Sequence, residues 1–465
     1  MHPTHRWILA LTLLLAAGPM AAQSDPGIDL GRLERVIDSI AYRAIATRGT
    51  PGVSVAVAKD GQVVFAKGYG ESDIEHAVAA RPETVYRIGS ITKQFTAAII
   101  MRLVERGEIA LDDPVTRFLP EYDMQGHTVT VRHLLNHTSG IFSYTSLGED
   151  AWQTIFRHDL TDRELIDLFE REPFDFEPGA EQRYNNSAYV LLGPIIEAVT
   201  GTPYARYLEE ELLAPLGLEH TAYCDVTRIV PHRASGYEDQ EGEWVNASFL
   251  SMNVPGGAGA MCSTVGDLSA WTRMLHRGEV VSAGSLQEMT TPTVVASGDT
   301  IPYGFGLAVG ELEGHPRVGH DGGINGFISS LVHYPDDGVT VVVLTNSGSG
   351  PAGAVQGMVS RAALGLELPR VVDRPVTESL IQRVVGTYVL QLNGNSMELI
   401  VFDEEGQLMG QVGGQAASRL RWQGDTTFVL ASNDGLRFVF EPAEGPAQRV
   451  VLHQDDVEVP GERVR

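Results

Sequence analysis

The sequence predicts an α+β fold: an antiparallel sheet flanked by helices and joined to an all-helical subdomain, followed by a small all-β, barrel-like domain. Three observations predict it. Hairpin patterns occur near both ends of residues 28–365, helical patterns fill the middle, and short alternating strands follow residue 376. At 465 residues the chain exceeds the size of one hydrophobic core. We therefore expect a first domain at 28–365, a linker at 366–375 and a second domain at 376–465.

The first elements are a helix and a hairpin. Apolar residues recur at spacings of three and four over residues 30–44, which is one face of an amphipathic helix: Leu30, Leu33, Ile37, Ile40 and Ala44. Two β-branched runs then flank Lys59-Asp60-Gly61, and Asp-Gly between such runs is a strong hairpin signal.

Helices dominate the middle of the chain. Apolar patterns bounded by Gly or Pro predict helices over residues 91–106, 189–200 and 203–213. Strands return at 327–334 and 339–345, on either side of Pro-Asp-Asp-Gly. We expect strands from both ends of this region to close one sheet around a helical middle.

The C-terminal part has a different pattern. Residues 365–375 contain two prolines, Pro369 and Pro375, and short alternating strands follow, among them 397–402, 426–430 and 436–440. This pattern predicts the all-β domain.

Composition excludes several classes of protein. Hydrophobic residues make up 43% and charged residues 20%, as in ordinary globular proteins. The net charge of −26 repels phosphate backbones and anionic lipid surfaces, so we expect no nucleic-acid partner. The two cysteines lack the spacing of a metal cluster, and we expect neither a metal nor a cofactor.

The N-terminus predicts export. Residues 1–22 combine a short region with Arg6, an apolar run and small residues ending at Ala22, as in a secretory signal peptide. We expect cleavage after Ala22 and a periplasmic or secreted protein with no stable membrane span after cleavage. An uncleaved signal anchor is the alternative.

A serine and a lysine form the first candidate catalytic pair. Ser90 and Lys93 are three residues apart at the start of a predicted helix, so the hydroxyl and the amine share one face of its first turn. An amine whose pKa is lowered by burial can activate a serine nucleophile. The chain has only three lysines, and a helix cap with a solvated lysine is the alternative interpretation.

Two further clusters carry polar groups suited to catalysis. Tyr184 and Asn186 precede an apolar helical run; the phenol can act as a base if nearby cations stabilise the phenolate. Asn186 can bind a substrate amide or cap the helix. His320 leads through Gly322 and Gly323 into a strand, and we expect the Gly323 and Ser90 N–H groups to form an oxyanion hole. A glycine-rich turn with a surface histidine is the alternative for this cluster.

With these clusters in order, residues 30–365 resemble the serine β-lactamase and penicillin-binding superfamily, in the branch of class C β-lactamases, D-Ala-D-Ala carboxypeptidases and related esterases. The segments HLLNHTSGI at 133–141 and LLAPLGLEHT at 212–221 support the match. The resemblance implies a β-lactamase/transpeptidase-like fold, and the C-terminal domain resembles appended lipocalin-like barrels.

The resemblance also implies roles. Ser90 would be the acylated nucleophile, Lys93 its activating partner and Tyr184 the general base. Asn186 would hold the substrate amide. His320 stands where many relatives have lysine and would contact a substrate carboxylate or the Tyr184 oxygen, with Gly323 as the second oxyanion donor.

The two cysteines, Cys224 and Cys262, lie in a chain that we expect to reach a compartment permitting disulfides. We predict that they form a disulfide. Two buried, inert thiols are the alternative.

These observations predict a serine hydrolase that forms an acyl-enzyme on amide, lactam or ester bonds, of the β-lactamase, D-alanyl-D-alanine carboxypeptidase, D-aminopeptidase or esterase type. The substrate would be a small molecule or peptide: a β-lactam, a D-amino-acid peptide or an ester. The alternative is a penicillin- or peptide-binding protein of the same fold without turnover, and a Ser-Lys dyad protease without the tyrosine is a second rival.

Overall fold

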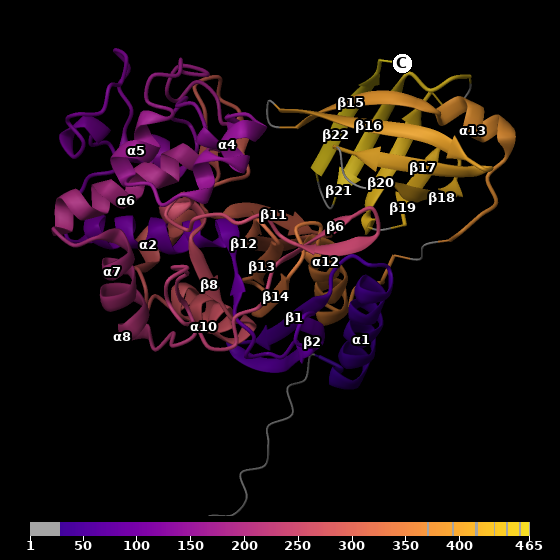
Figure 1. Ribbon diagram of the computed structural model, residues 1–465, viewed down its shortest axis with the longest axis horizontal. Helices are drawn as coiled ribbons and strands as arrows, with labels where there is room; N and C mark the ends of the chain where they lie inside the picture. The colour runs from indigo at the N-terminus through magenta and orange to yellow at the C-terminus, as the bar shows by residue number, and fades with distance from the viewer. Residues whose placement is uncertain are drawn as a thin grey trace, which may run out of the picture.

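A computed structural model describes residues 28–369, 372–392, 395–413, 417–431, 433–442, 445–454 and 457–464 (Figure 1). The predicted signal peptide at 1–22 lies outside these residues and stays a prediction. Within the described part, no helix is both long and apolar enough to cross a membrane.

One antiparallel sheet of seven strands organises the first domain, in the order β11-β12-β13-β14-β1-β2-β3. The register pairs Val53 of β1 with Thr345 of β14, so strands from both ends of the domain do close one sheet, as predicted. The strands are β1 (Gly52–Lys59), β2 (Gln62–Asp73), β3 (Val78–Ala79), β11 (Ala308–Leu312), β12 (His315–Ile324), β13 (Phe327–Tyr334) and β14 (Val339–Thr345).

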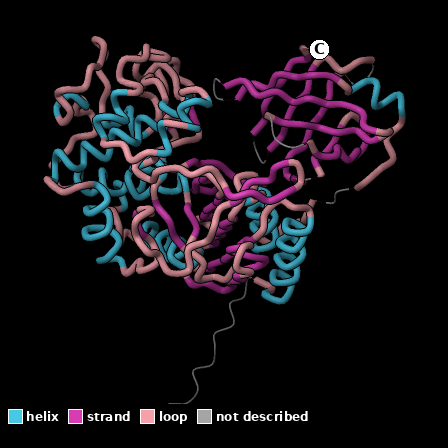
Figure 2. Tube along the Cα trace, in the orientation of Figure 1, coloured by secondary structure: helices cyan, strands magenta, loops and turns pink. Residues whose placement is uncertain are grey.

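The central strands are apolar on both faces because both faces are covered. Val53, Val55 and Val57 of β1 pack in the cluster formed with the helices α1 (Leu30–Ala46) and α12 (Ala352–Ala363), whereas Ala56 packs in the opposite cluster. This alternation follows the two-residue period of a strand. Helices therefore lie on either side of the sheet (Figure 2).

The helical subdomain is inserted between β4 (Tyr86–Arg87) and β8 (Met261–Ser263), and its central helix α2 is buried on nearly all sides. The predicted helix at 203–213 is interrupted, since a π-helical segment follows its first turn.

The helical elements outside α1 and α12 are η1 (Gly89–Ile91), α2 (Thr92–Glu105), η2 (Val115–Arg117), α3 (Val131–Leu135), η3 (Tyr144–Ser146), α4 (Glu149–Gln153), η4 (Ile155–Arg157), α5 (Asp162–Asp167), α6 (Asn186–Thr200), α7 (Tyr204–Tyr207), η5 (Leu208–Leu213), α8 (Ala214–Leu216), α9 (Gly256–Gly259), α10 (Val265–His276), α11 (Ala283–Thr290) and α13 (Glu378–Val384).

The second domain is a closed barrel of eight antiparallel strands, which confirms the barrel-like prediction. Helix α13 precedes it. Side chains such as Tyr388, Phe428, Phe438 and Phe440 fill the barrel. Its strands are β15 (Gly386–Leu392), β16 (Asn395–Glu404), β17 (Gln407–Val412), β18 (Ser418–Gly424), β19 (Thr427–Leu430), β20 (Asn433–Glu441), β21 (Arg449–Gln454) and β22 (Val457–Arg463).

Several short strands lie outside these two sheets: β5 (Ala222–Tyr223), β6 (Tyr237–Gln240), β7 (Glu243–Asn246), β9 (Thr293–Val294) and β10 (Thr300–Ile301). Strands β4, β8 and β5 form a small sheet beside the helical subdomain.

The predicted disulfide between Cys224 and Cys262 is wrong, since both residues are buried free thiols. Cys262 pairs with Ala222, whereas the Cys224 N–H donates to the carbonyl oxygen of Ala260 at 2.8 Å. The cysteines therefore come from neighbouring strands, and their two thiols lie within hydrogen-bond distance of each other without being bonded.

Candidate active site

Ser90 and Lys93 meet where a 3-10 turn runs directly into a helix. Ser90 lies in η1, and Lys93 lies on the first turn of α2. The Lys93 Nζ atom is 3.1 Å from Ser90 Oγ. The structure thus brings together the hydroxyl and the amine of the predicted pair.

Lys93 is completely buried, with 0% of its surface exposed. Its Nζ donates to Asn186 Oδ1 at 2.8 Å and to the carbonyl oxygen of Ala258 at 2.9 Å. Both partners are neutral, so they satisfy the amine without stabilising a positive charge as a carboxylate would. Burial holds the pKa of Lys93 well below the usual value for an amine.

Tyr184 and Asn186 lie at the start of α6. The helix is capped by Asn185, whose side chain accepts from the Ala188 N–H at 2.9 Å. Asn186 is therefore not the cap, and its side chain is free to hold Lys93. Its Nδ2 faces Thr145 Oγ1 at 3.5 Å.

Among the described residues, none makes a well-formed hydrogen bond to the buried Tyr184 hydroxyl, and the Ser90 side chain is the polar group within its reach. Lys93 Nζ lies 4.7 Å from the centre of the Tyr184 ring. Burial raises the pKa of Tyr184, opposite to the lowering by cations that the sequence analysis assumed. The loss of solvent is the first cause of this rise, and the Ser90 hydroxyl, which lowers the pKa of Tyr184, offsets it only in part.

The glycines of β12 bring this strand against the serine turn. A Cβ atom on Gly322 would lie 2.0 Å from the carbonyl oxygen of Ile88, so only glycine fits. A Cβ atom on Gly89 would lie 2.8 Å from the Gly323 nitrogen. The backbone beside Ser90 and the Gly323 N–H therefore lie next to each other, as an oxyanion hole requires.

His320 is only 8% exposed, so it is not the surface histidine of the alternative interpretation. Its Nε2 is 2.9 Å from the Tyr303 hydroxyl, and its Nδ1 is 2.5 Å from the carbonyl oxygen of Asp321. The ring lies 5.9 Å from the Tyr184 ring, but its hydrogen bonds go elsewhere. Burial, and then the neighbouring Lys93, lower the pKa of His320 to about 3.

Two further residues of this site, His137 and Tyr303, are not among those predicted from the sequence. His137 is fully buried, its ring lies 4.4 Å from the Tyr184 ring, and its Nε2 is 3.2 Å from the Tyr303 hydroxyl. His137 does occur in the segment HLLNHTSGI, so its place in that motif was the available signal. Tyr303 lies in a loop without periodicity, and no local pattern marks it.

The fold and this site define the class of protein: a hydrolase with the fold of serine β-lactamases and penicillin-binding proteins. Residues 37–364 match the Beta-lactamase family, which is more than half of the chain, and the chain belongs to that family.

Three known proteins illustrate the relationship. The chain is 27% identical over 379 residues to a D-aminopeptidase of Gluconobacter oxydans (strain 621H), covering 79% of this chain and 68% of the relative. The structure of the octameric penicillin-binding protein homologue from Pyrococcus abyssi is 29% identical, with a TM-score of 0.66, and covers 94% of this chain and 100% of that one. The crystal structure of a D-stereospecific amidohydrolase from Streptomyces sp. is 30% identical, with a TM-score of 0.62. The match covers 72% of this chain and 99% of that one.

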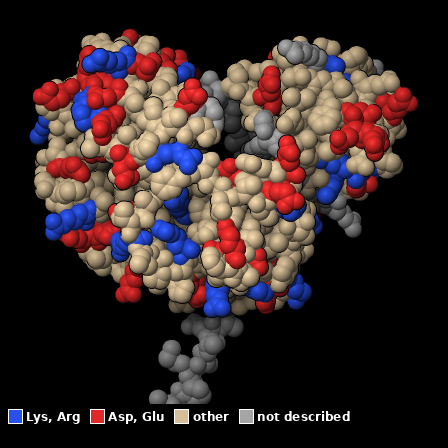
Figure 3. Space-filling view, in the orientation of Figure 1, with Lys and Arg blue, Asp and Glu red and all other residues tan. Residues whose placement is uncertain are grey.

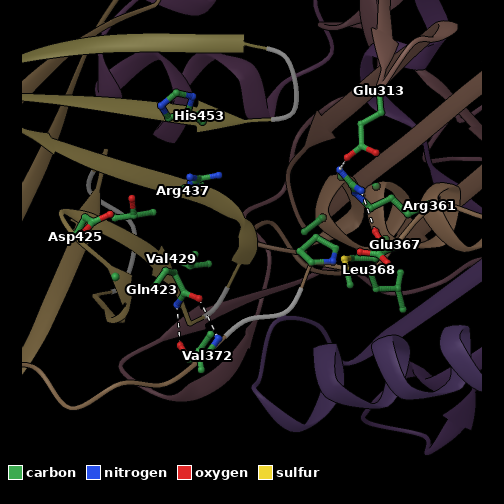
Figure 4. Close-up of a pocket in the computed structure, with 17 residues that line it drawn as sticks. Glu313, Arg361, Glu367, Leu368, Val372, Gln423, Asp425, Val429, Arg437 and His453 are labelled. Carbon is green, nitrogen blue, oxygen red and sulfur yellow. Dashed lines mark hydrogen bonds and ion pairs between the residues drawn. The ribbon is translucent and has the colours of Figure 1, made fainter.

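A separate cavity of about 790 Å³ lies between α12 and the barrel (Figure 4). Arg437 and His453 approach it from the barrel, opposite the ion pair of Arg361 with Glu313, whose N–O distance is 2.6 Å. Its lining includes none of the predicted site residues. Among the described residues, no group of three or more His, Cys, Asp and Glu side chains is arranged to hold a metal ion.

Proposed function

We propose that this protein hydrolyses amide bonds by two-step acyl transfer, with Ser90 as nucleophile, Lys93 as its base and Tyr184 as the proton donor to the leaving group. The observation that carries the proposal is the buried amine beside the serine hydroxyl, 3.1 Å away.

The hydrogen bonds of Lys93 support its role as the base. A neutral amine has two hydrogens and one lone pair. Asn186 Oδ1 and the Ala258 carbonyl oxygen can only accept, so they take both hydrogens. The lone pair then faces Ser90, where it can remove the hydroxyl proton.

Tyr184 is suited to deliver that proton. Its raised pKa keeps the phenol protonated at neutral pH, and it faces Ser90. As the C–N bond breaks, the phenol gives its proton to the leaving nitrogen and Lys93 returns the serine proton to the phenol oxygen. The Ser90 and Gly323 N–H groups stabilise the oxyanion.

Water completes the cycle. It adds to the acyl ester, its proton passes through the same groups to Ser90 Oγ, and the carboxylic acid leaves. One water is consumed for each amide bond broken, so the reaction balances without a cofactor.

We propose amides and short peptides of D-amino acids as the substrate class. The similarity to a D-aminopeptidase and to a D-stereospecific amidohydrolase supports this choice. β-Lactams and esters react by the same chemistry, so a substrate panel has to separate the three classes.

The test compares p-nitroanilides of D- and L-amino acids, a chromogenic cephalosporin and p-nitrophenyl acetate by kcat/KM. We expect the D-anilides to be preferred. Ser90→Ala should reduce turnover at least about 1000-fold and abolish labelling by a serine-directed fluorophosphonate, since it removes the nucleophile. Ser297→Ala, in an exposed loop, is the matched control. Labelling without turnover on any substrate would favour the binding-protein alternative instead.

A further inference from the structure

A chain of hydrogen bonds crosses the site behind the catalytic groups. The Asn185 N–H donates to His137 Nδ1 at 3.1 Å, and His137 Nε2 lies 3.2 Å from the Tyr303 hydroxyl. That hydroxyl is 2.9 Å from His320 Nε2, and His320 Nδ1 is 2.5 Å from the Asp321 carbonyl oxygen. The chain thus joins the loop before α6 to the strand that carries Gly322 and Gly323.

The groups at the two ends of this series of hydrogen bonds determine where the hydrogens on the ring nitrogens lie. At one end an N–H can only donate, so His137 Nδ1 carries a lone pair and a neutral His137 has its hydrogen on Nε2. At the other end a carbonyl oxygen can only accept, so His320 Nδ1 carries the hydrogen. Tyr303 accepts from His137 and has one hydrogen left. The Tyr189 hydroxyl also lies within hydrogen-bond distance of Tyr303, but an imidazole lone pair is a better acceptor than a phenol oxygen, so Tyr303 donates to His320 Nε2 when His320 is neutral.

We propose that Tyr303 is a positioning residue: its hydroxyl holds His320 as the neutral tautomer with hydrogen on Nδ1, and so denies the site a cationic imidazole for a substrate carboxylate. The part of this inference that concerns substrates rests on the proposed function. The family resemblance implies, by contrast, that His320 contacts a substrate carboxylate or the Tyr184 oxygen.

The groups around His320 also disfavour a positive charge on its imidazole. Lys93 and His137 approach it from α2 and from the loop after α3, and a charge on either would repel a charged imidazole. Tyr184, in the loop before α6, and Tyr189 of α6 present phenols, and Tyr189 donates to the Leu135 carbonyl oxygen at 2.7 Å. Asp321 contributes its backbone oxygen to His320, and its side chain is exposed.

The consequence is a preference among substrates. A substrate with a free carboxylate next to the scissile bond finds no positive charge on His320, whereas an amide or a blocked peptide needs none. We therefore expect D-dipeptide amides to be better substrates than the same D-dipeptides with a free C-terminus.

The first measurement is the tautomer of His320 in the intact protein. Two-bond ¹H–¹⁵N spectra of protein labelled with ¹⁵N-histidine distinguish protonated from unprotonated ring nitrogens, and the His320 signals are those lost in His320→Gln. At pH 7 we expect protonated Nδ1 and unprotonated Nε2. A His320 that is cationic, or that carries its hydrogen on Nε2, would overturn the proposal.

The second measurement uses Tyr303→Phe. Losing the donated hydrogen bond should shift the His320 Nε2 signal and raise the kcat/KM of the free-acid dipeptide relative to its amide by about fivefold at pH 6, as the imidazole becomes easier to protonate. Tyr204→Phe is the control. The buried hydroxyl of Tyr204 lies 2.7 Å from the Thr96 hydroxyl of α2 and takes no part in the hydrogen bonds that lead to His320.

The outcomes separate this inference from the proposed function. If Tyr303→Phe and Tyr204→Phe leave the His320 signals equally unchanged, Tyr303 has no positioning role. An equal loss of kcat on both substrates with an unchanged Nε2 signal would also reject it. Absence of any amidase activity in the unmodified protein would reject the proposed function, while the tautomer measurement still decides the role of Tyr303.

Discussion

At the scale of the residue, the site depends on one side chain in an unfavourable place. Lys93 is fully buried and has neutral partners, so folding desolvates an amine that the unfolded chain leaves in water. The same burial favours the neutral amine, whose lone pair is what the proposed attack by Ser90 requires. The destabilising position and the proposed chemistry therefore have a single physical cause.

Lys93→Met should test this directly. We expect kcat/KM to fall by about 100-fold or more, since the base is lost while the apolar stem is kept. Lys59→Met, on the hairpin between β1 and β2 and bonded to the Asp337 carbonyl oxygen, should stay within about twofold. The rate of fluorophosphonate labelling is a second measurement on both variants. Equal losses of kcat/KM and of labelling rate in Lys93→Met and Lys59→Met would show that Lys93 is not the base.

Some residues of the site could be predicted from the sequence and others could not. Ser90 and Lys93 lie close in sequence, so helical spacing alone places them together. Tyr184 and His320 are indicated by their motifs, but the hydrogen bond of His320 to Tyr303 is not, because Tyr303 lies in a loop that no local pattern marks. Burial, the first cause of the raised pKa of Tyr184, is a tertiary property that no local pattern reveals.

At the scale of the element, the site depends on how closely β12 approaches η1. The Ser329 hydroxyl of β13 donates to the Ile88 carbonyl oxygen at 2.9 Å, which ties the sheet to this turn. Gly322 leaves the space that the approach needs. The hairpins and the main helices were predictable from turn residues and periodicity, whereas this contact between strand and turn is a tertiary feature.

Gly322→Ala should separate β12 from η1. The new methyl group would lie 2.0 Å from the carbonyl oxygen of Ile88. We therefore expect β12 to shift, so that the Gly323 N–H no longer points toward the substrate oxyanion. Losing one oxyanion donor costs about 100- to 1000-fold in kcat. In Gly310→Ala on β11, the nearest atom is 3.7 Å away, and turnover should be unchanged. Native-like kcat in Gly322→Ala, with circular dichroism confirming the fold, would contradict the assignment.

At the scale of the whole molecule, charge and burial set the response to pH. Acidic side chains are spread over both domains on the face shown in Figure 3, in keeping with the net charge of −26. Away from the catalytic site, the rings of His276 and His333 contact each other with centres 4.1 Å apart and planes tilted by 47°. Burial, and then His333, lower the pKa of His276 to about 3, and burial lowers that of His333 to about 4.

These histidines should make the protein less stable in acid. Below pH 6.5 the unfolded chain binds protons that the folded protein does not, so the free energy of unfolding falls as the pH falls. Each such histidine contributes a slope of up to about 1.4 kcal/mol per pH unit. His276→Gln should flatten the decline between pH 6 and 4.5 by about that amount in urea unfolding, whereas the exposed His158→Gln should not. If the free energy of unfolding depends on pH in the same way in the unmodified protein and in both variants, His276 does not cause the loss of stability in acid.

The pairing of Val53 with Thr345 also bears on biosynthesis. When β1 leaves the ribosome, the neighbour that will cover its second edge has not yet been translated, and the whole helical insertion must emerge first. An apolar strand with unpaired N–H and C=O groups is a template for wrong partners during that interval. The nascent chain therefore needs either a holding chaperone or delayed folding until the last strands of the sheet have been made.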